Sequence, residues 1–380
     1  MALALTGGRV LNGRGLVEGL GVVIDGGRIV AVGPEAEALA RADQRYDLAG
    51  GALVPGFVDT QVNGGGGVLF NDDLSVEAIA AIGAAHRRFG TTGFLPTLIS
   101  EDLDAIDRAM RAVEQAIQAG VPGVLGVHVE GPFLNAARAG IHDKAKFRVL
   151  DARASALLGS LKAGRTLVTL APERTDPGCI RKLAQDRVVV AAGHTDATYE
   201  QIGEALTAGV TGFTHLFNAM SPLASRAPGA VGAALEDQTA FCGIIVDGRH
   251  IHPAVLRLAL RCRPLDRFML VTDAMPSVGL TEKTFSLQGR MITVQDGVCV
   301  GPDGTLAGSD LDMASAVRNT VEMLGVDLAD ALRMASLAPA QFLGLDHELG
   351  RIAPGLRADL ALLDDQGRVV TTWIGGQLPD

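Results

Sequence analysis

The chain is 380 residues long, 48% of its residues are apolar, and its formal net charge is −10 at neutral pH. This length accommodates one barrel with a small additional domain, and the apolar content excludes intrinsic disorder. The negative charge argues against a surface for nucleic acid or anionic membranes, so any phosphate site must be built from a few individually placed residues.

The N-terminal segment MALALTGGRV has too short an apolar run for a secretory signal and lacks a basic lead. No uncharged apolar stretch approaches the roughly 18 residues of a membrane-spanning helix. The four cysteines are scattered without a Cys-x-x-Cys motif, which is typical of reduced thiols rather than of a disulfide framework. We therefore expect a cytoplasmic protein with no membrane segment and no nucleic-acid partner.

Short β-prone runs separated by glycine-rich turns fill the first 50 residues, as in GLGVVID and GRIVAVG. Similar runs, ADLALLD and RVVTTWIGG, return near the C-terminal end after the helix-like segment ADALRMASLAPAQFLG. Short strands bounded by turn residues are typical of hairpins. We therefore expect residues 1–54 and 346–380 to pair into one small β-sandwich domain.

Between these ends, eight apolar runs of strand length alternate with segments of mostly helical periodicity, such as SVEAIAAIGAAHRRF and DAIDRAMRAVEQAIQAG. The eight runs are LVPGFVDT, TGFLPTLIS, GVLGVHVEG, LVTLAPE, VVVAAGH, GVTGFTHLF, CGIIVDG and FMLVTDA. Near-continuous apolar strands that alternate with helices are typical of a closed parallel sheet. The α/β pattern therefore predicts a (β/α)8 TIM barrel over residues 55–345.

Two segments depart from this alternation. SPLASRAPGAVGAALEDQ, in the sixth interval, is the weakest helix candidate, and we expect its first half to be a loop. KTFSLQGRMITVQDGVCVGPDGTL follows the eighth run and predicts a β-hairpin, after which DLDMASAVRNTVEML has helical periodicity.

Polar side chains close several of the predicted strands, which is where a barrel carries its active site. Glu130 ends the third strand, His194 the fifth, His215 the sixth and Asp273 the eighth. Two imidazoles and a carboxylate suit a zinc site with an open position for water, and Asp273 is then placed to move protons. Taken singly, such a histidine is more often a hydrogen-bonded structural residue, and Asp273 also fits a cap of the following turn. Their joint placement favours the metal site.

Six motifs, taken in chain order, are similar to those of one enzyme family. They are HVEGPFLN, AAGHTDAT, THLFNAMSPL, GIIVDGRHI, LVTDAM and LAGSDLDM. In these motifs and their order the chain resembles the N-acetylglucosamine-6-phosphate deacetylases of the amidohydrolase superfamily. The resemblance covers the barrel and the β domain at the termini. Six ordered motifs are strong evidence, whereas any one of them alone would be weak.

The resemblance implies a single metal ion. In many amidohydrolases the first strand ends in Asp-x-His-x-His, but Gln61 and Asn63 stand at the two histidine positions here. Members of the family with this Gln-x-Asn pattern work with one metal. The implied site is one divalent ion per subunit, held by Glu130, His194 and His215. Such a set suits Zn²⁺ and also admits Fe²⁺, Co²⁺ or Mn²⁺.

The resemblance also implies catalytic roles. Asp273 would take the proton of a metal-activated water and return it to the departing amine, because an amide nitrogen leaves poorly until it is protonated. His142, in GIHDKAK, matches the family histidine near the acetyl carbonyl and would stabilise the developing oxyanion. From the residues alone, an exposed loop histidine is the alternative. Asp59 would be a supporting carboxylate behind the site.

Substrate recognition is implied for a further set of residues. Asn218 and Ala219 follow the sixth strand, where backbone N–H groups in a turn can bind an anion. Arg226 and His250 match phosphate contacts of the family, some of which cross a dimer interface, so the resemblance implies a homodimer. Arg226 would otherwise be a solvated loop charge. The motif LAGSDLDM would start a helix beside the sugar, and its first residues would shape the pocket: Leu306, Ala307 and Gly308.

We therefore expect hydrolysis of N-acetylglucosamine 6-phosphate to glucosamine 6-phosphate and acetate by a metal-dependent deacetylase of amino-sugar metabolism. Another amidohydrolase, such as an N-acyl-D-amino-acid deacylase or a dihydroorotase, is the nearest alternative, since a barrel alone does not determine function. A catalytically inactive barrel that serves as a binding protein is the alternative from another class. Its best argument is the replaced His-x-His, and the retained polar strand ends argue against it.

Overall fold

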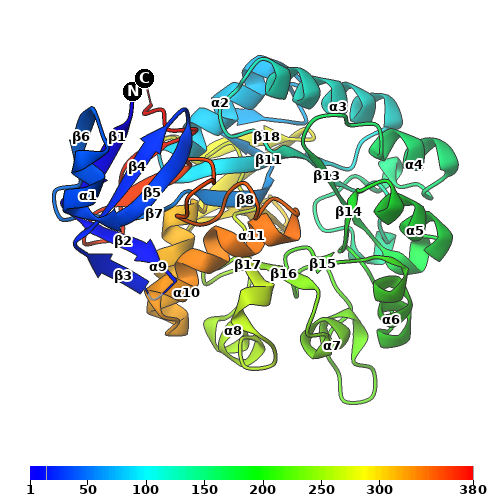
Figure 1. The fold of residues 1–380 in the computed structure, drawn as a ribbon. Helices are drawn as coiled ribbons and strands as arrows, with labels where there is room; N and C mark the ends of the chain where they lie inside the picture. The colour runs from blue at the N-terminus through cyan, green and yellow to red at the C-terminus, as the bar shows by residue number, and fades with distance from the viewer. Residues whose placement is uncertain (14, 380) are drawn as a thin grey trace.

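Parallel strands form the centre of the protein. The computed structural model describes residues 1–13 and 15–379, and its largest sheet has eight parallel strands in chain order (Figure 1). They are β8 (Phe57–Val62), β11 (Thr91–Ile99), β12 (Gly126–Glu130), β13 (Arg165–Leu170), β14 (Val189–Ala192), β15 (Gly212–Phe213), β16 (Phe241–Ile244) and β17 (Phe268–Leu270). The sheet closes beyond β17, where Val62 bridges Ala274 and the Asp273 N–H donates to the Gln61 carbonyl at 3.0 Å. The predicted (β/α)8 barrel is therefore confirmed.

Helices cover the outside of this sheet (Figure 1). The α-helices of the barrel are α2 (Val76–Arg87), α3 (Leu103–Gln118), α4 (Ala152–Leu158), α5 (Pro177–Gln185), α6 (Tyr199–Ala208), α7 (Gly229–Glu236), α8 (Pro253–Ala259), α9 (Met313–Leu324), α10 (Leu328–Ala335) and α11 (Leu337–Phe342). Short 3-10 turns are η1 (Ala136–Arg138), η2 (Lys144–Lys146), η3 (Pro172–Arg174) and η4 (Leu265–Arg267).

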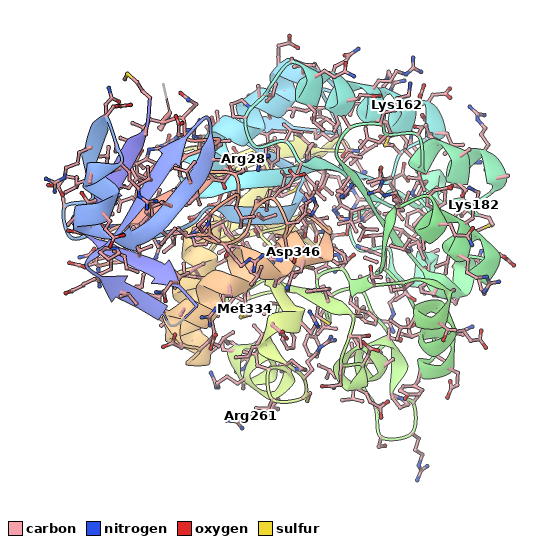
Figure 2. The ribbon with its side chains drawn as sticks, in the orientation of Figure 1. Arg28, Lys162, Lys182, Arg261, Met334 and Asp346 are labelled. Carbon is pink, nitrogen blue, oxygen red and sulfur yellow. The ribbon has the colours of Figure 1, made fainter. Side chains whose placement is uncertain are left out.

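Local sequence explains where these helices begin and how they pack. Ser75 and Asp102 cap α2 and α3 by accepting hydrogen bonds from backbone N–H groups of the first turn. Lys182 and Arg261 extend outward from the helical rim, whereas Met334 of α10 is buried (Figure 2). Within the described part of the chain, no helix is both long and apolar enough to span a membrane.

A second body is built from both ends of the chain, which lie close together (Figure 1). One of its sheets has the order β5 (Arg28–Pro34), β4 (Leu20–Asp25), β1 (Leu3–Thr6), β6 (Gln44–Asp47). The other has the order β23 (Val369–Trp373), β22 (Leu360–Leu363), β7 (Ala52–Pro55), β2 (Arg9–Asn12), β3 (Gly15–Glu18). Leu5, Ile29, Leu53, Leu360 and Trp373 belong to the apolar core between them. The predicted β-sandwich from the two termini is confirmed, and a short helix, α1 (Glu35–Ala40), adds to it.

The segment after β17 is larger than the predicted hairpin. It forms a four-stranded antiparallel sheet of β18 (Thr284–Leu287), β19 (Arg290–Gln295), β20 (Val298–Val300) and β21 (Leu306–Ser309). The motif LAGSDLDM therefore begins as strand β21, which was not expected, and it starts a helix only with its last two residues, Asp312 and Met313. Helix α9 begins only at Met313, because Asp312 caps it by accepting a hydrogen bond from the Ser315 N–H.

ADALRMASLAPAQFLG also differs from the expected single helix. It forms α10 and α11, which meet at the non-helical Ser336. Pro339 explains the break, because proline has no N–H to donate and its ring clashes with the carbonyl four residues earlier. The remaining strands are β9 (Gly64–Gly65) and β10 (Val68–Leu69), a small hairpin within the glycine-rich turn after β8.

Candidate active site

A cavity of about 340 Å³ lies at the carboxyl ends of the barrel strands. Every site residue predicted from the sequence, except Arg226, lines this cavity: Glu130, His142, His194, His215, Asn218, Ala219, His250, Asp273, Leu306, Ala307 and Gly308. Strand β21 contributes one wall, so the four-stranded sheet after β17 shapes the cavity together with the barrel.

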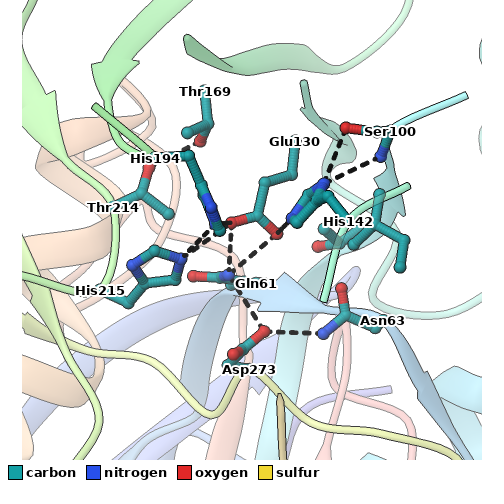
Figure 3. A network of polar contacts seen from close by, with 12 residues as sticks. Gln61, Asn63, Ser100, Glu130, His142, Thr169, His194, Thr214, His215 and Asp273 are labelled. Carbon is teal, nitrogen blue, oxygen red and sulfur yellow. Dashed lines mark hydrogen bonds and ion pairs between the residues drawn. The ribbon is translucent and has the colours of Figure 1, made fainter. Parts of the chain in front are cut away.

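Glu130, His194 and His215 converge at the base of the cavity (Figure 3). Their potential ligand atoms all lie within 4.8 Å of one another. Glu130 Oε1 is 3.0 Å from His215 Nε2 and 3.2 Å from His194 Nε2. Burial opposes ionisation of Glu130, yet the polar contacts with His194 and His215 hold the pKa of this carboxyl well below its usual value. A buried anionic carboxylate beside two imidazoles fits a divalent cation.

The imidazole of His194 is oriented by the backbone of a neighbouring loop. Its Nδ1 lies 2.9 Å from the Arg138 carbonyl oxygen and must donate to it, which leaves the Nε2 lone pair directed at the cluster. A metal-binding histidine usually donates its second nitrogen in this way. His215 Nδ1, by contrast, has no hydrogen-bond partner among the described residues.

Three of the ionisable cavity residues have left-handed backbone conformations. The φ angles are +47° at His194, +30° at His215 and +52° at Asp273. Such angles in residues other than glycine cost about 1–3 kcal/mol each and tend to occur at functional sites, where the surrounding structure imposes them. The turns that follow β14, β15 and β17 are thus bent so that these side chains face the cavity.

Asp273 is held by one of its carboxylate oxygens. Oδ1 accepts hydrogen bonds from Asn63 Nδ2 at 2.7 Å and from Gln61 Nε2 at 3.1 Å. Oδ2 has no hydrogen-bond partner in the described chain and remains available to a reactant. Burial, reinforced by the charge of Glu130, raises the pKa of Asp273 above its ordinary value. A carboxyl that is anchored by one oxygen and raised in pKa is suited to exchange protons.

Gln61 and Asn63 fill the space beside the cluster with amide donors. Gln61 Nε2 lies 3.2 Å from each Glu130 oxygen as well as near Asp273 (Figure 3). Both amide groups therefore direct N–H bonds, not lone pairs, at the carboxylates. Asp59 lies deeper, where it accepts a hydrogen bond from Thr272 Oγ1 at 2.5 Å, and burial raises its pKa to about 7.

His142 is a neutral imidazole on the opposite side of Glu130. Burial, together with repulsion from His194, lowers the pKa of His142 to about 3. Its Nδ1 accepts a hydrogen bond from the Ser100 N–H at 3.3 Å and lies 2.7 Å from Ser100 Oγ. The proton must then be on Nε2, which is 4.0 Å from Glu130 Oε2. His142 can thus donate a hydrogen bond at the cluster.

The far end of the cavity offers few groups for an anion. Asp247 Oδ2 accepts a hydrogen bond from His250 Nδ1 at 2.5 Å, which fixes the imidazole of His250. The Asn218 N–H already donates to the His215 carbonyl at 3.0 Å. The Ala219 N–H, in contrast, finds no acceptor in the described chain. Arg226 is exposed on the loop before α7, outside the cavity of its own chain.

Sequence reasoning did not identify Ser100, Asp247, Thr272 or the carbonyl of Arg138. Ser100 directly follows β11, so it has the same strand-end placement that singled out Glu130. Asp247 precedes His250 by three residues within one motif. The Arg138 carbonyl has no side-chain signature, so no sequence pattern could have revealed its contact with His194.

Comparison with known proteins gives consistent matches over nearly the whole chain. A family model described as "Amidohydrolase family" matches residues 52–378. An N-acetylgalactosamine-6-phosphate deacetylase of a Shewanella strain is 41% identical, with 99% of this chain and 95% of the relative covered. An N-acetylglucosamine-6-phosphate deacetylase of Haemophilus influenzae is 34% identical, with 94% and 93% covered. The crystal structure of such a deacetylase from Pasteurella multocida superposes with a TM-score of 0.96 at 32% identity, covering 100% of both chains.

Proposed function

This chain belongs to the amidohydrolase family, and we propose from this premise that its cavity removes the acetyl group of N-acetylglucosamine 6-phosphate. The products are glucosamine 6-phosphate and acetate. One observation carries the proposal: a buried Glu–His–His cluster and a separately anchored Asp273 face the same cavity. Relatives that share this chemistry on phosphorylated amino sugars support it.

Glu130, His194 and His215 would hold one divalent metal ion, most suitably Zn²⁺, although Fe²⁺, Co²⁺ and Mn²⁺ accept the same ligands. When bound, such an ion lowers the pKa of water toward neutrality and polarises a carbonyl group. The amides of Gln61 and Asn63 support a single ion per chain, because they present donors where a second cation would need lone pairs.

Proton transfer and stabilisation of the developing negative charge are assigned to two different residues. Asp273 uses its free Oδ2 to take a proton from the attacking water and then delivers it to the amide nitrogen, so that the C–N bond breaks with the electron pair on nitrogen. The Nε2–H of His142 donates to the carbonyl oxygen as negative charge develops on it. Because His142 is neutral, it stabilises that charge without giving up its proton.

Substrate binding would extend from the cluster toward His250. The imidazole of His250 and the N–H of Ala219 are placed to bind the phosphate, beside the turn at Asn218. Leu306, Ala307 and Gly308 of β21 line the space between, where the sugar would lie. Arg226 would reach a phosphate only in the cavity of a second subunit, so we propose a homodimer. We also propose the domain division 1–54 with 346–380, and 55–345.

N-acetylgalactosamine 6-phosphate is a second candidate substrate. The Shewanella relative that carries this name shows the higher identity, 41% against 34% for the Haemophilus influenzae enzyme. The two sugars differ only in the configuration of the hydroxyl group at C4, and a ring bound beside Leu306, Ala307 and Gly308 would face the backbone of β21.

The test is acetate release by metal-replete protein from four substrates: both sugar phosphates and both free sugars. We expect kcat/KM for the phosphorylated sugars to exceed that for the free sugars by at least ~100-fold, since charge-assisted contacts to the phosphate contribute several kcal/mol. The ratio between the two phosphates identifies the preferred configuration at C4. Failure to release acetate from any of them would refute the proposed deacetylation.

Two variants distinguish the residues that bind the metal from the residue that transfers protons. Asp273→Asn should keep the metal and lower kcat by about 10²–10⁴-fold, whereas Glu130→Gln should weaken metal retention. Metal content after dialysis and single-turnover acetate release measure the two effects. Glu114→Gln, a change on the outer helix α3, is the matched control. Full metal retention in Glu130→Gln would remove Glu130 from the ligand set.

A further inference from the structure

We infer that Thr272 and Ser309 are positioning residues that hold Asp273 in its left-handed backbone conformation and so direct its free carboxylate oxygen into the cavity. The inference rests on the proposed role of Asp273 in deacetylation. Neither residue lines the cavity, and both side chains are fully buried. Their effect on the reaction is therefore indirect, and both residues make hydrogen bonds to the turn that carries Asp273.

Thr272 closes a turn around Asp273. Its hydroxyl accepts a hydrogen bond from the Ala274 N–H at 3.2 Å, which links the residues on either side of Asp273. The same hydroxyl donates its only proton to Asp59 Oδ2 at 2.5 Å. Asp59 also accepts from the Gln61 N–H at 3.2 Å on strand β8. The turn is thereby attached to a strand of the barrel through one buried carboxylate.

Ser309 holds the same turn from the opposite side. Its hydroxyl donates to the Thr272 carbonyl at 2.5 Å, and its N–H donates to the Asp273 carbonyl at 2.9 Å. Its own carbonyl accepts from the Met275 N–H at 3.0 Å. The Asp273 N–H, finally, donates to the Gln61 carbonyl at 3.0 Å. Both main-chain polar groups of Asp273 are thus bound, one to β8 and the other to β21.

Strand β21 approaches this turn as closely as its backbone allows. A Cβ atom at Gly308 would lie 2.8 Å from the Asp273 carbonyl oxygen, which is closer than real Cβ contacts. The strand that lines the sugar space and the turn that carries Asp273 therefore form one packed unit. A φ of +52° at Asp273 costs about 1–3 kcal/mol, and the hydrogen bonds of Thr272 and Ser309 offset that cost.

The consequence is that loss of either hydroxyl lets the Asp273 backbone relax. A misplacement of about 1 Å in a reacting group can cost about 100-fold in rate. The cluster of Glu130, His194 and His215 and the anion end of the cavity make no direct hydrogen bond to Thr272 or Ser309 within the described chain. Metal retention and substrate binding should therefore be nearly unchanged while turnover falls.

The experiment compares Thr272→Val, which removes the hydroxyl at almost constant volume, with Thr272→Ser, which keeps it, and with Ser309→Ala. We expect kcat for N-acetylglucosamine 6-phosphate to fall about 10–100-fold in Thr272→Val and Ser309→Ala, with KM and bound metal within about 3-fold of wild type. Thr272→Ser should restore kcat to within about 3-fold. Thr320→Val, which removes a buried hydroxyl on α9 outside the cavity, is the matched control.

The outcomes are distinguishable. If Thr272→Val and Ser309→Ala both keep kcat within 2-fold of an active wild type, the positioning role is overturned. If Thr272→Ser is as impaired as Thr272→Val, the hydroxyl is not responsible and the role of Thr272 is overturned. If Thr272→Val does not fold, Ser309→Ala decides, because it removes one hydrogen bond to the turn and leaves the buried Asp59 with its Thr272 partner. A wild type that releases no acetate would instead refute the proposed function itself.

Discussion

At the scale of single residues, hydrogen bonds from neighbouring groups fix the orientation of the side chains that face this cavity. Ser100 shows this for His142, since two contacts from one residue determine which ring nitrogen carries the proton. If Ser100 supplied no hydrogen bond, the imidazole could present an Nε2 lone pair to the carbonyl oxygen of the substrate. That arrangement would repel the developing negative charge instead of stabilising it.

Ser100→Ala should therefore lower kcat by about 10-fold, a loss expected from one hydrogen bond that orients the proposed oxyanion donor His142. The loss should be incomplete, because the backbone N–H of residue 100 still donates to His142 Nδ1. Steady-state kinetics with equal metal loading measures it. Ser155→Ala, at another buried serine on α4, is the control and should leave kcat unchanged. An unaltered kcat in Ser100→Ala would show that the N–H alone sets the tautomer.

At the scale of secondary-structure elements, strand β21 joins the cavity wall to the turn that carries Asp273. Gly308 has a φ of +72°, and a side chain there would also meet Met275 Cγ at 2.6 Å. Gly304, in the turn before β21, has a similar φ of +81° but nothing within 4 Å of its Cβ position. A substitution at Gly304 therefore tests left-handed backbone strain alone, whereas a substitution at Gly308 tests strain together with close packing.

Gly308→Ala should lower both kcat and the melting temperature, because strand β21 has to move away from Asp273. We expect a destabilisation of about 2–4 kcal/mol, made up of left-handed strain and overpacking. Gly304→Ala should cost only about 1 kcal/mol from strain and retain kcat. Thermal unfolding and acetate release measure both changes. Equal effects of the two substitutions would show that close contact between β21 and Asp273 is unimportant.

The order of strands and helices was predictable from the sequence, whereas the additional strand β21 and the break between α10 and α11 were not. Apolar runs with polar ends identified the barrel and placed Glu130, His194, His215 and Asp273 at one edge, because parallel strands share their carboxyl ends. The additional strand β21 was missed since LAGSDLDM precedes a true helix and contains a helix cap. The contacts that orient the site, such as the Arg138 carbonyl on His194, depend on backbone geometry that no residue pattern encodes.

At the scale of the whole molecule, a single chain offers few groups that could bind a phosphate. Arg226 extends from an exposed loop and does not reach the cavity of its own chain. The cavity itself is lined by His250, whose Nδ1 is bound to Asp247, and by Ala219, whose N–H has no acceptor among the described residues. Since a guanidinium is suited to bidentate phosphate binding, a second subunit that places Arg226 at the cavity mouth would complete the site.

Mixing two defective variants tests this arrangement. Arg226→Ala leaves Asp273 intact, and Asp273→Asn leaves Arg226 intact. If Arg226 acts in the partner's cavity, refolded mixtures should contain heterodimers with one complete site. With random pairing of equal amounts, about half of the dimers are heterodimers, and each heterodimer has one complete site out of two. The mixture would then show about one quarter of wild-type kcat/KM, well above either variant alone. If Arg226 acts within its own chain, or not at all, the mixture should show only the average of the two variants. The control is a mixture of Glu236→Gln with Asp273→Asn, refolded in the same way. In this mixture the sites that keep Asp273 should have full activity, whichever subunit they pair with.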